Sequence, residues 1–597
     1  MMSEWQNKNP DQSRVGGLRQ TLLLLSMFKK IKTIISKINA QSQSITSAAI
    51  IIGALSVVSR LLGIIRDRVL ASQFGAGDIL DAYYAAFRLP DLVYNLLILG
   101  AVSAGLIPVF ASLLAKHQEQ EAWKLINSIL NLLSVALLIA CGLLFVSAPW
   151  LMPFITPGFA PEKMELAVAL SRVMFLSPIF LGLSSIFSSV LQAQRKFLLY
   201  SLAPIIYNLG IIFGALFLVA PFGVMGLAWG VVIGAFLHMI IQLLPLFGTK
   251  FKYRLDFNWR NKHVLEVFKM MVPRTVSLAV NQINFLIITV VASTLAAGSL
   301  SIFTFANNLQ NFPLGIFGVS LGIAALPVLS TLAAQKKNQE FVAVISTTFR
   351  QTLFLIVPVA IILYVLRAQI VRVLLGGGRF DWYDTRLTAA SLAIFCIGLF
   401  AAGAYPLIIR GFYALRDTKT PFYAGLLSMI INVAGILVFR FVFSFQNWFS
   451  FTAAALLRLS DLWGYVDMRV LALPAAMSVS AIFELLLLMV LLRNKIGRLD
   501  IRRIANSAWR IAIASIGGGL ITYFSLRFID DYLAVQTFWG IFCQGLAAGV
   551  LGLLGYAALG LILKIEEMFI FLTSMKRRLF KSAVIMADNG VNNGSGV

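Results

Sequence analysis

The chain has few charged residues for its length. Asp, Glu, Lys and Arg make up 12% of its 597 residues, whereas a typical soluble domain carries about 25%. Hydrophobic residues make up 59%, and the mean hydropathy is +0.87. A water-soluble fold of this length cannot bury so much apolar surface. The composition therefore excludes a soluble globular protein and indicates a membrane protein.

Cysteine and histidine are also scarce, with three residues of each type: Cys141, Cys396 and Cys543, and His117, His238 and His263. Each cysteine lies singly inside an apolar run, and the histidines are dispersed along the chain. Neither type has the spacing of a disulfide framework or of a metal site. We therefore expect no metal centre and no cofactor.

Motifs of catalysis are missing as well. The chain has no Gly-rich phosphate loop followed by Lys and Ser or Thr, no nucleophile elbow and no His-rich zinc motif. It also lacks the paired carboxylates that a membrane glycosyltransferase or polymerase needs. We predict that the protein is not an enzyme and draws energy from an ion, voltage or substrate gradient. Glu484, alone in an apolar run, is a candidate for ion coupling, and a polar contact between helices is the alternative.

Long apolar segments, by contrast, recur from about residue 46 to residue 564. A span needs about 20 apolar residues, and it must be helical because lipid offers the backbone no hydrogen bonds. We predict an all-α polytopic membrane protein with about fourteen transmembrane helices, the second and eighth long enough to tilt or bend. The predicted spans are 46–72, 79–114, 126–150, 165–190, 198–219, 223–247, 264–294, 300–334, 342–366, 387–410, 421–440, 470–492, 504–527 and 537–563.

The distribution of positive charge predicts the orientation. The net charge is +24, which in a soluble protein suggests nucleic acid; in a membrane protein it reflects Lys and Arg in cytoplasmic loops. With the N-terminus inside, cytoplasmic segments hold 31 Lys and Arg and outside loops hold 9, counting span ends with the loops. We therefore predict both termini in the cytoplasm and no nucleic-acid partner. The outside loop at 367–386, with four Arg, departs most from this pattern.

The composition of three segments outside the spans predicts a separate structure for each. Residues 17–38 are typical of a basic amphipathic helix on the membrane surface, with a poorly ordered extension as the alternative. The tail from about 583 has the composition of a disordered segment. The polar and aromatic stretch Ser444 to Met468 predicts an interfacial helix outside the membrane.

A weak internal repeat suggests the domain layout. Pro108–Ala115 ends the second span, and the similar Pro327–Ala334 ends the eighth, 219 residues later. A shift of six spans predicts two six-helix lobes in the same orientation, with the last two spans as an appendage. The predicted parts are a cytoplasmic extension (1–45), an N-terminal lobe (46–247), a basic linker (248–263), a C-terminal lobe (264–492), two further helices (493–563) and a cytoplasmic tail (564–597).

Charged residues inside the first span are the sharpest chemical signal. At 1.5 Å per residue, Arg60 lies about 18 Å and Arg66 about 9 Å from the outer end of the span. Buried charges normally face a cavity or a partner. Asp67 and Asp81 are candidate partners, and we expect them to neutralise Arg68 and at most one more arginine.

The predicted spans as a whole are richer in cations than in acids. Clear of the span ends they contain eight Arg and one Lys, with few carboxylates at depth. Guanidinium groups suit bidentate binding of phosphate. This balance favours an anionic substrate, and a purely structural role for the arginines is the alternative. The cations are Arg60, Arg66, Arg68, Arg88, Arg172, Arg274, Arg350, Arg510 and Lys269.

Several motifs in the same order and spacing resemble the MurJ (MviN) family of lipid II flippases, part of the MOP exporter superfamily. The resemblance covers about residues 46 to 495. Its motifs are Ser59–Asp67, Phe74–Gly77, Asp81-Ala82, Ala86–Pro90, Gly100–Ser103, Pro273-Arg274, Gln282–Asn284, Asn307–Val319 and Phe412–Pro421.

The resemblance implies two six-helix lobes around a central cationic cavity, two extra C-terminal helices, and flipping of lipid II across the bacterial inner membrane. Lipid II, or a similar anionic polyprenyl-linked saccharide, is the implied substrate, and the cell-wall synthesis machinery is a possible partner. The resemblance implies that Arg60 and Arg66 hold the anionic head of the substrate and that Asp81 is functionally important. The full set of candidate substrate-binding residues is Ser59, Arg60, Arg66, Asp67, Asp81, Arg88, Arg274 and Asn308.

Some positions depart from the family pattern. Tyr94-Asn95 replace a frequent Arg pair, Asn308 replaces a frequent Arg, and Ile288 stands where relatives can have Asp or Asn. These departures leave open a flippase of another lipid-linked oligosaccharide. A membrane glycosyltransferase or polymerase, and a non-transporting scaffold, are the alternatives from other classes.

Overall fold

The computed structural model confirms the all-α prediction. It describes residues 45–99, 105–460, 467–532 and 537–573. Within these ranges the chain is helical, and the pairing of Gly377 with Phe380 is an isolated bridge rather than a strand. The helix predicted at 17–38 and the tail from 583 lie outside the described residues.

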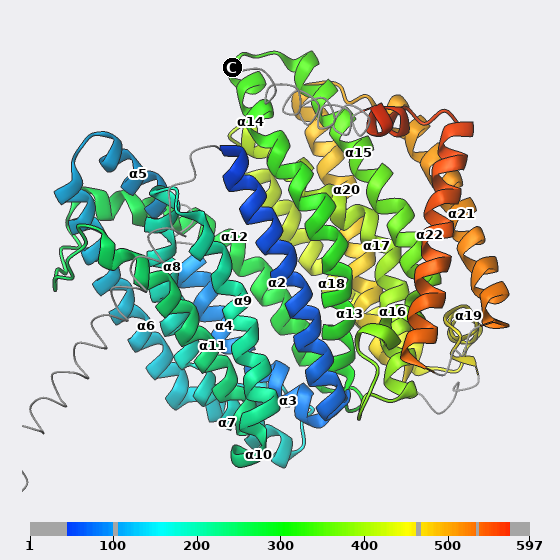
Figure 1. Cartoon of the computed structure of the whole chain (residues 1–597), viewed down its shortest axis with the longest axis horizontal. Helices are drawn as coiled ribbons and strands as arrows, with labels where there is room; N and C mark the ends of the chain where they lie inside the picture. Colours follow the sequence, from blue (N-terminus) through cyan, green and yellow to red (C-terminus); the bar gives the residue numbers. More distant parts are fainter. Residues whose placement is uncertain (1–44, 100–104, 461–466, 533–536, 574–597) are drawn as a thin grey trace, which may run out of the picture. The chain divides into compact units, whose positions relative to one another are not determined.

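The first half of the chain contains both long continuous helices and short or broken ones (Figure 1). They are α2 (Ile45–Phe74), α3 (Asp78–Ala86), α4 (Arg88–Val93), the π-helix η1 (Tyr94–Leu99), α5 (Ile107–Ala115), α6 (Glu119–Ile155), α7 (Pro161–Met174), α8 (Leu176–Ala193), α9 (Phe197–Phe213), the π-helix η3 (Gly214–Leu218), α10 (Val219–Phe222), α11 (Met225–Leu243), the 3-10 helix η4 (Leu244–Gly248) and α12 (Lys262–Ser293).

The second half continues in the same way. Its helices are α13 (Ser299–Pro313), the π-helix η5 (Leu314–Val319), α14 (Ser320–Ala334), α15 (Asn338–Val365), α16 (Arg367–Leu374), α17 (Trp382–Ala414), α18 (Lys419–Ser444), α19 (Trp448–Leu457), the 3-10 helix η7 (Met468–Leu471), α20 (Ala472–Ile496), α21 (Ile501–Asp530) and α22 (Phe538–Ile562).

Eleven helices of the described residues are long and apolar enough to cross a membrane. They coincide with eleven of the fourteen predicted spans. The other three positions hold α2, the broken segment from α3 to α5, and α12, whose shorter apolar stretch is Leu278–Ser293. The count of fourteen therefore stays a prediction, while a multi-pass membrane protein is established. The second and eighth predicted spans are both interrupted by a π-helix, η1 and η5.

These interruptions extend the internal repeat beyond the short sequence similarity. The π-helices η1 and η5 begin at Tyr94 and Leu314, so they occupy equivalent places in the two halves. Beyond the repeated segments, a residue with positive φ lies two positions after each helix, His117 (58°) after α5 and Lys336 (57°) after α14. These similar breaks and helix ends agree with the predicted repeat.

The described chain forms two compact units, whose boundaries fall inside α2, α4, α6, α7 and α12. The first contains the described residues up to Gly63, Leu89–Val146 and Arg172–Leu278, and the second contains Ile64–Arg88, Ser147–Ser171 and the described residues from Ala279 onward. The predicted division into lobes at 46–247 and 264–492 stays a prediction.

Small residues hold the first unit together. Helix α11 packs on α9, beside it in Figure 1, through Gly210 and Gly214 on one side and Gly230 and Gly234 on the other. A Cβ on Gly210 would meet the Cα of Gly234, and one on Gly214 would meet the Cα of Gly230. Only glycine allows this approach, which is typical of helix pairs in membranes.

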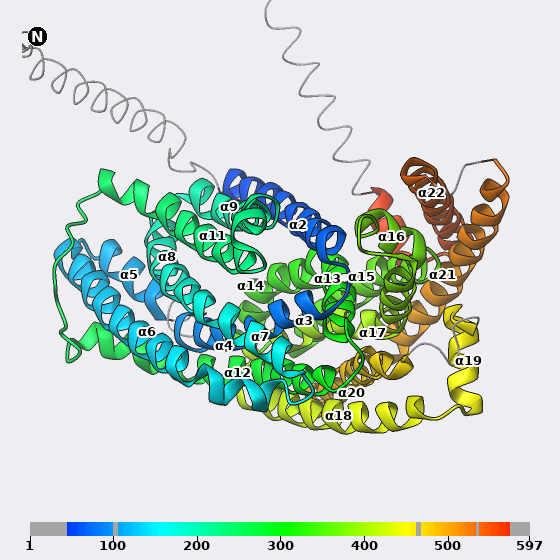
Figure 2. The same cartoon turned by 90° about the horizontal axis from the view of Figure 1, so that it is seen from below.

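The second unit is organised around α17, which packs against α13, α14, α15 and α20. Helices α21 and α22 run side by side, and α21 also packs on α15 (Figure 2). Shortly after α22 in the chain come Glu566 and Glu567. The buried Arg350 of α15 binds Glu567 (2.5 Å) and Glu566 (2.9 Å), and Ser507 of α21 donates to Glu567 (2.9 Å). Arg350, one of the predicted span cations, is thus neutralised within the protein.

Candidate functional site

Three predicted site residues meet where α2 passes α13. Arg66 binds the Oδ1 atom of Asp67 through Nε (3.0 Å) and Nη2 (2.8 Å). Asn308 of α13 donates to the other oxygen, Oδ2, at 2.9 Å. Asp67 is 5% exposed, whereas the Arg66 side chain is 25% exposed. The buried carboxylate therefore holds the guanidinium in place, and a quarter of the Arg66 side chain stays accessible.

Arg68 corrects one expectation. Asp67 and Asp81 do not neutralise it, because both carboxylates are occupied by other partners. Its guanidinium donates to the carbonyl oxygen of Val373 and lies 5.1 Å from the ring centroid of Phe538. A carbonyl dipole and an aromatic face satisfy this cation.

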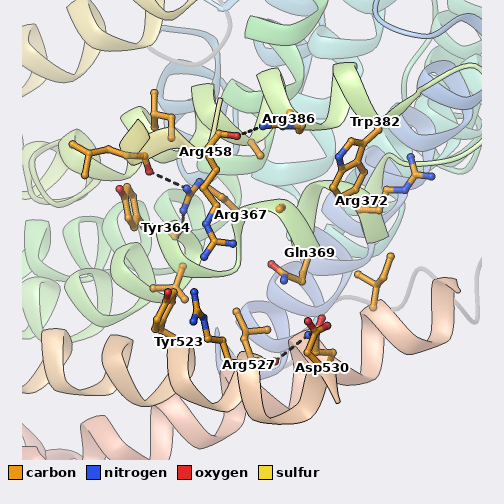
Figure 3. A pocket seen from close by; sticks show the side chains of 18 of the residues that line it. Tyr364, Arg367, Gln369, Arg372, Trp382, Arg386, Arg458, Tyr523, Arg527 and Asp530 are labelled. Atoms are coloured by element: carbon orange, nitrogen blue, oxygen red, sulfur yellow. Dashed lines mark hydrogen bonds between the residues drawn. The ribbon is translucent and has the colours of Figure 1, made fainter. Parts of the chain in front are cut away.

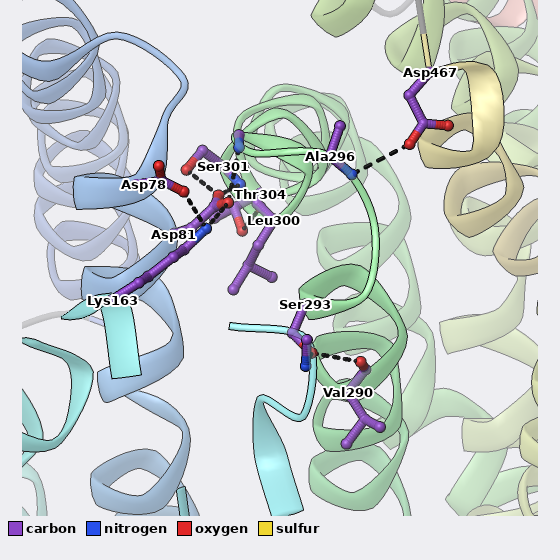
Figure 4. Close-up of polar contacts among 12 residues, drawn as sticks. Asp78, Asp81, Lys163, Val290, Ser293, Ala296, Leu300, Ser301, Thr304 and Asp467 are labelled. Atoms are coloured by element: carbon purple, nitrogen blue, oxygen red, sulfur yellow. Dashed lines mark hydrogen bonds and ion pairs between the residues drawn. The ribbon is translucent and has the colours of Figure 1, made fainter. Parts of the chain in front are cut away.

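Asp81 is the most completely bound carboxylate of the candidate set (Figure 4). It is 2% exposed, and its Oδ2 accepts from Lys163 Nζ (2.9 Å) and from the backbone N–H of Gly298 (2.8 Å). Its Oδ1 accepts from the backbone N–H (2.9 Å) and hydroxyl (2.7 Å) of Ser301. The two oxygens of this buried carboxylate therefore accept from four donors.

These contacts make Asp81 a cap for a helix distant in sequence. The first turn of α13 has unpaired N–H groups, and no residue of its own caps them with a side chain. Gly298 precedes the helix with φ 85°, a conformation that favours glycine, and a Cβ there would meet the carbonyl oxygen of Ala76. The Asp81 carboxylate supplies the missing acceptor and lies at the positive end of the helix dipole.

The remaining predicted residues are not members of these two clusters. Arg60 is exposed on α2, and the carbonyl oxygen of Ser59 accepts from Asn208 at 3.4 Å. Arg88 donates to the hydroxyl of Thr289 (2.7 Å) and lies 5.6 Å from the Phe285 ring centroid. Arg274 belongs to α12, and its side chain is outside the described residues.

Two of the three positions that lack the family's arginines, Tyr94 and Asn95, make local contacts in η1. The hydroxyls of Tyr94 and Ser185 are 3.3 Å apart, and Asn95 donates to the carbonyl oxygen of Asp91 at 2.8 Å. These side chains tie the π-helix to its surroundings in the first unit. They add no positive charge there.

Glu484 lies on α20 between neighbouring helices. It is next to Tyr405 of α17 and Ser428 of α18. Its Oε1 atom is buried and has no hydrogen-bond partner among the described residues. A carboxyl group with one unsatisfied oxygen in an apolar helix bundle is a suitable place for a proton or a small cation.

The motif Phe412–Pro421 forms the turn between α17 and α18. Asp417 accepts from the backbone N–H of Lys419 (3.1 Å) and of Thr420 (3.0 Å), and Lys495 donates to it from the end of α20. Although burial opposes ionisation, the bonds from Lys495 and Thr420 lower the pKa of Asp417 to about 2. The motif therefore has a clear structural role in joining three helices.

Reasoning from the sequence missed Lys163, Ser301 and Thr289, the partners of Asp81 and Arg88. Each is far from its partner in sequence, so no helical periodicity connects them. The available signal for Lys163 was that it is the one basic residue in the predicted outside loop 151–164. Within the described ranges, no cluster of three or more His, Cys, Asp or Glu side chains could hold a metal ion.

Comparison with known proteins agrees with these features. The family described as "Lipid II flippase MurJ" matches residues 70–543. The protein named "Lipid II flippase MurJ" from Burkholderia cenocepacia is 30% identical over 405 residues, 66% of this chain and 78% of the relative.

Two solved structures share the fold. One is described as "Lipid II flippase MurJ, inward closed conformation"; it has a TM-score of 0.67 and 25% identity, and the match covers 86% of this chain and 98% of that one. The other is an inward-facing multidrug resistance MATE transporter of the MOP superfamily, with a TM-score of 0.59 and 12% identity over 75% of this chain and 98% of that one. The second likeness concerns the fold alone.

Proposed function

Because the chain belongs to the MurJ family of lipid II flippases, we propose that it moves lipid II, the undecaprenyl-pyrophosphate-linked precursor of peptidoglycan, from the inner to the outer leaflet. The family match over residues 70–543 is the observation that carries this proposal. The excess of arginine over carboxylate in the predicted spans agrees with an anionic substrate. Alternating access through a cation-lined path is the mechanism that this chemistry favours.

Depletion of the protein in living cells tests the function. We expect lipid II to accumulate in the inner leaflet and to fall in the outer leaflet, measured by an outer-leaflet probe and by total lipid II. An unchanged distribution between the leaflets would contradict the proposal. Accumulation of a different lipid-linked saccharide would favour the second candidate function, a flippase of another lipid-linked oligosaccharide. The observation behind this candidate is that Tyr94, Asn95 and Asn308 stand where the family often has arginine.

We propose that Arg60 and Arg66 contact the substrate pyrophosphate. Arg66 is fixed by Asp67 and stays partly exposed, and Arg60 is exposed. A guanidinium held in this way can donate two hydrogen bonds to phosphate oxygens. Asp67 and Asn308 hold Arg66 in place, and Ser59, Asp81, Arg88 and Arg274 complete the candidate set.

The orientation is part of the proposal. The 31 to 9 division of Lys and Arg supports cytoplasmic termini in the bacterial inner membrane. Reporter fusions at Gly158 and Gly223 should report the outside, and one at His117 the inside. The reverse pattern would refute this topology.

Glu484 gives a prediction about energy coupling. Replacing Glu484 with Gln keeps the size and polarity of the side chain and removes its titration. If this carboxyl group couples proton movement to transport, the E484Q variant should fold normally but lose most of its response to an imposed pH gradient, about tenfold or more. Transport into the outer leaflet of vesicles measures this.

The matched control is Ser428→Ala, which changes a neighbour of Glu484 without altering charge. It should leave the pH response in place. A pH response of E484Q equal to that of the native protein would show that Glu484 makes a polar contact between helices and no more.

A further inference from the structure

Basic residues predicted to lie outside the membrane are concentrated in one place. Of the nine, five line a single cavity in the second unit: Arg367, Arg372, Arg386, Arg458 and Arg527 (Figure 3). They come from α16, α17, the end of α19 and the end of α21. The loop 367–386, which departs most from the predicted charge pattern, contributes three of them. That departure therefore has a structural basis.

The cavity is large, and most of its charged lining residues are basic. Its volume is about 1260 Å³, and Asp530 and Asp531 are the two carboxylates among its lining residues. Four of the five arginines form no ion pair with a carboxylate of the described residues; these are Arg367, Arg372, Arg458 and Arg527. Like charges that gather in this way repel one another unless an anion is present.

The positions of the guanidinium groups are fixed by neutral partners. Arg367 is 9% exposed and donates to the carbonyl oxygens of Tyr364 (2.7 Å) and Leu456 (3.2 Å). Arg458 and Arg527 lie 5.9 Å and 5.3 Å from the centroid of one ring, that of Tyr523. The pKa of Arg367 is lowered mainly by burial and also by the nearby positive charge of Arg458. The protein thus holds several cations together without neutralising them.

The rest of the lining is apolar and aromatic. Leu456, Leu457 and Ile541 line the cavity together with Trp382, and the side chains of Trp382 and Leu456 are 54% and 64% exposed. Aromatic residues of this kind are typical of the boundary between lipid and water. A free phosphate ion would fill little of this volume and would gain nothing from the apolar side chains.

We propose that this cavity binds the phosphate headgroup of an anionic membrane phospholipid, such as phosphatidylglycerol, with its acyl chains against the apolar lining. Basic pockets between membrane helices recognise such headgroups through the same chemistry. The phosphate of a lipid supplies the anion that the arginines lack. The site is separate from the candidate transport residues, and its occupation can be measured without transport.

Lipid retention on the purified full-length protein tests this proposal. In native mass spectrometry, after equilibration with mixed lipids, the native protein should retain phosphatidylglycerol about tenfold better than phosphatidylcholine. The double variant Arg372→Gln with Arg458→Gln should lose this preference. The control variant, Arg498→Gln with Arg502→Gln, removes two exposed arginines near the opposite end of α21 and should keep it.

Three results would overturn the proposal. One is a preference that survives in the double variant. Another is displacement of the phospholipid by millimolar inorganic pyrophosphate, which would make this a site for free anions. The third is preferential retention of an undecaprenyl-pyrophosphate lipid, which would make it a site for the substrate. If the double variant does not fold, the exposed Arg527→Gln should still weaken retention, and unchanged retention there also counts against the proposal.

Discussion

Replacing Asp81 with Asn should destabilise the protein and stop transport. In whichever way the amide is oriented, its NH2 group faces two donors: Lys163 and the Gly298 N–H on one side, or the N–H and hydroxyl of Ser301 on the other. Two buried donors lose their acceptor and meet another donor. Breaking a buried charge pair costs about 3–5 kcal/mol. The decrease in thermal unfolding temperature in detergent and the loss of complementation measure the effect.

The same cluster offers graded controls. Lys163→Met removes the countercharge but leaves the three donors at the start of α13, so the loss should be smaller, about 1.5–3 kcal/mol. Asp78 also binds Lys163 (2.7 Å), but its side chain is 65% exposed. Asp78→Asn should therefore cost about 1 kcal/mol or less. Equal losses for Asp78→Asn and Asp81→Asn would contradict the capping role of Asp81.

Arg66 should show two separable effects. In Arg66→Ala, Asp67 stays buried with Asn308 as its remaining described partner, so we expect a loss of about 3–5 kcal/mol of stability and little folded protein. Adding Asp67→Asn removes the buried charge and should restore folding. Transport should stay absent in the double variant, because no guanidinium is left to bind phosphate. Folded protein in the membrane and flipping in vesicles are measured separately.

Arg66→Lys distinguishes geometry from charge. Lysine keeps the positive charge next to Asp67 but loses the planar fork, so folding should be normal and transport should recover only in part. Full transport by the double variant Arg66→Ala with Asp67→Asn would show instead that Arg66 is structural. The structure identifies Asp67 as the partner to remove, because Asp67 binds Arg66 directly.

The sequence predicts a structural feature well when the interactions that determine the feature lie within one segment of the chain. Apolar runs and loop charges predict helices close to the observed ones, since span length and backbone hydrogen bonding are decided within each segment. The pair of Arg66 and Asp67 joins neighbours in the chain and was foreseen as one possibility. The π-helices η1 and η5 could not be predicted, because proline and glycine mark a break without specifying its form.

Long-range contacts explain the rest. Asp81 was predicted as a site residue, but its role as a cap for α13 depends on a residue 217 positions away. Arg68 was assigned to a carboxylate, and the structure gives it the carbonyl of Val373 instead. The four Arg of the loop 367–386 were seen as a departure from the charge pattern, and three of them converge with Arg458 and Arg527 only after α16, α19 and α21 have packed.

The partners of Asp81 are synthesised one after another as the chain grows. Ribosomes add about 5–20 residues per second, so Lys163, 82 residues later, is made about 4–16 s after Asp81, and Gly298, 217 residues later, about 11–43 s after it. In the growing chain the carboxylate can therefore meet its countercharge before the helix that it caps exists. We expect a disulfide between cysteines placed at positions 81 and 163 to form in nascent chains arrested before residue 298 is synthesised.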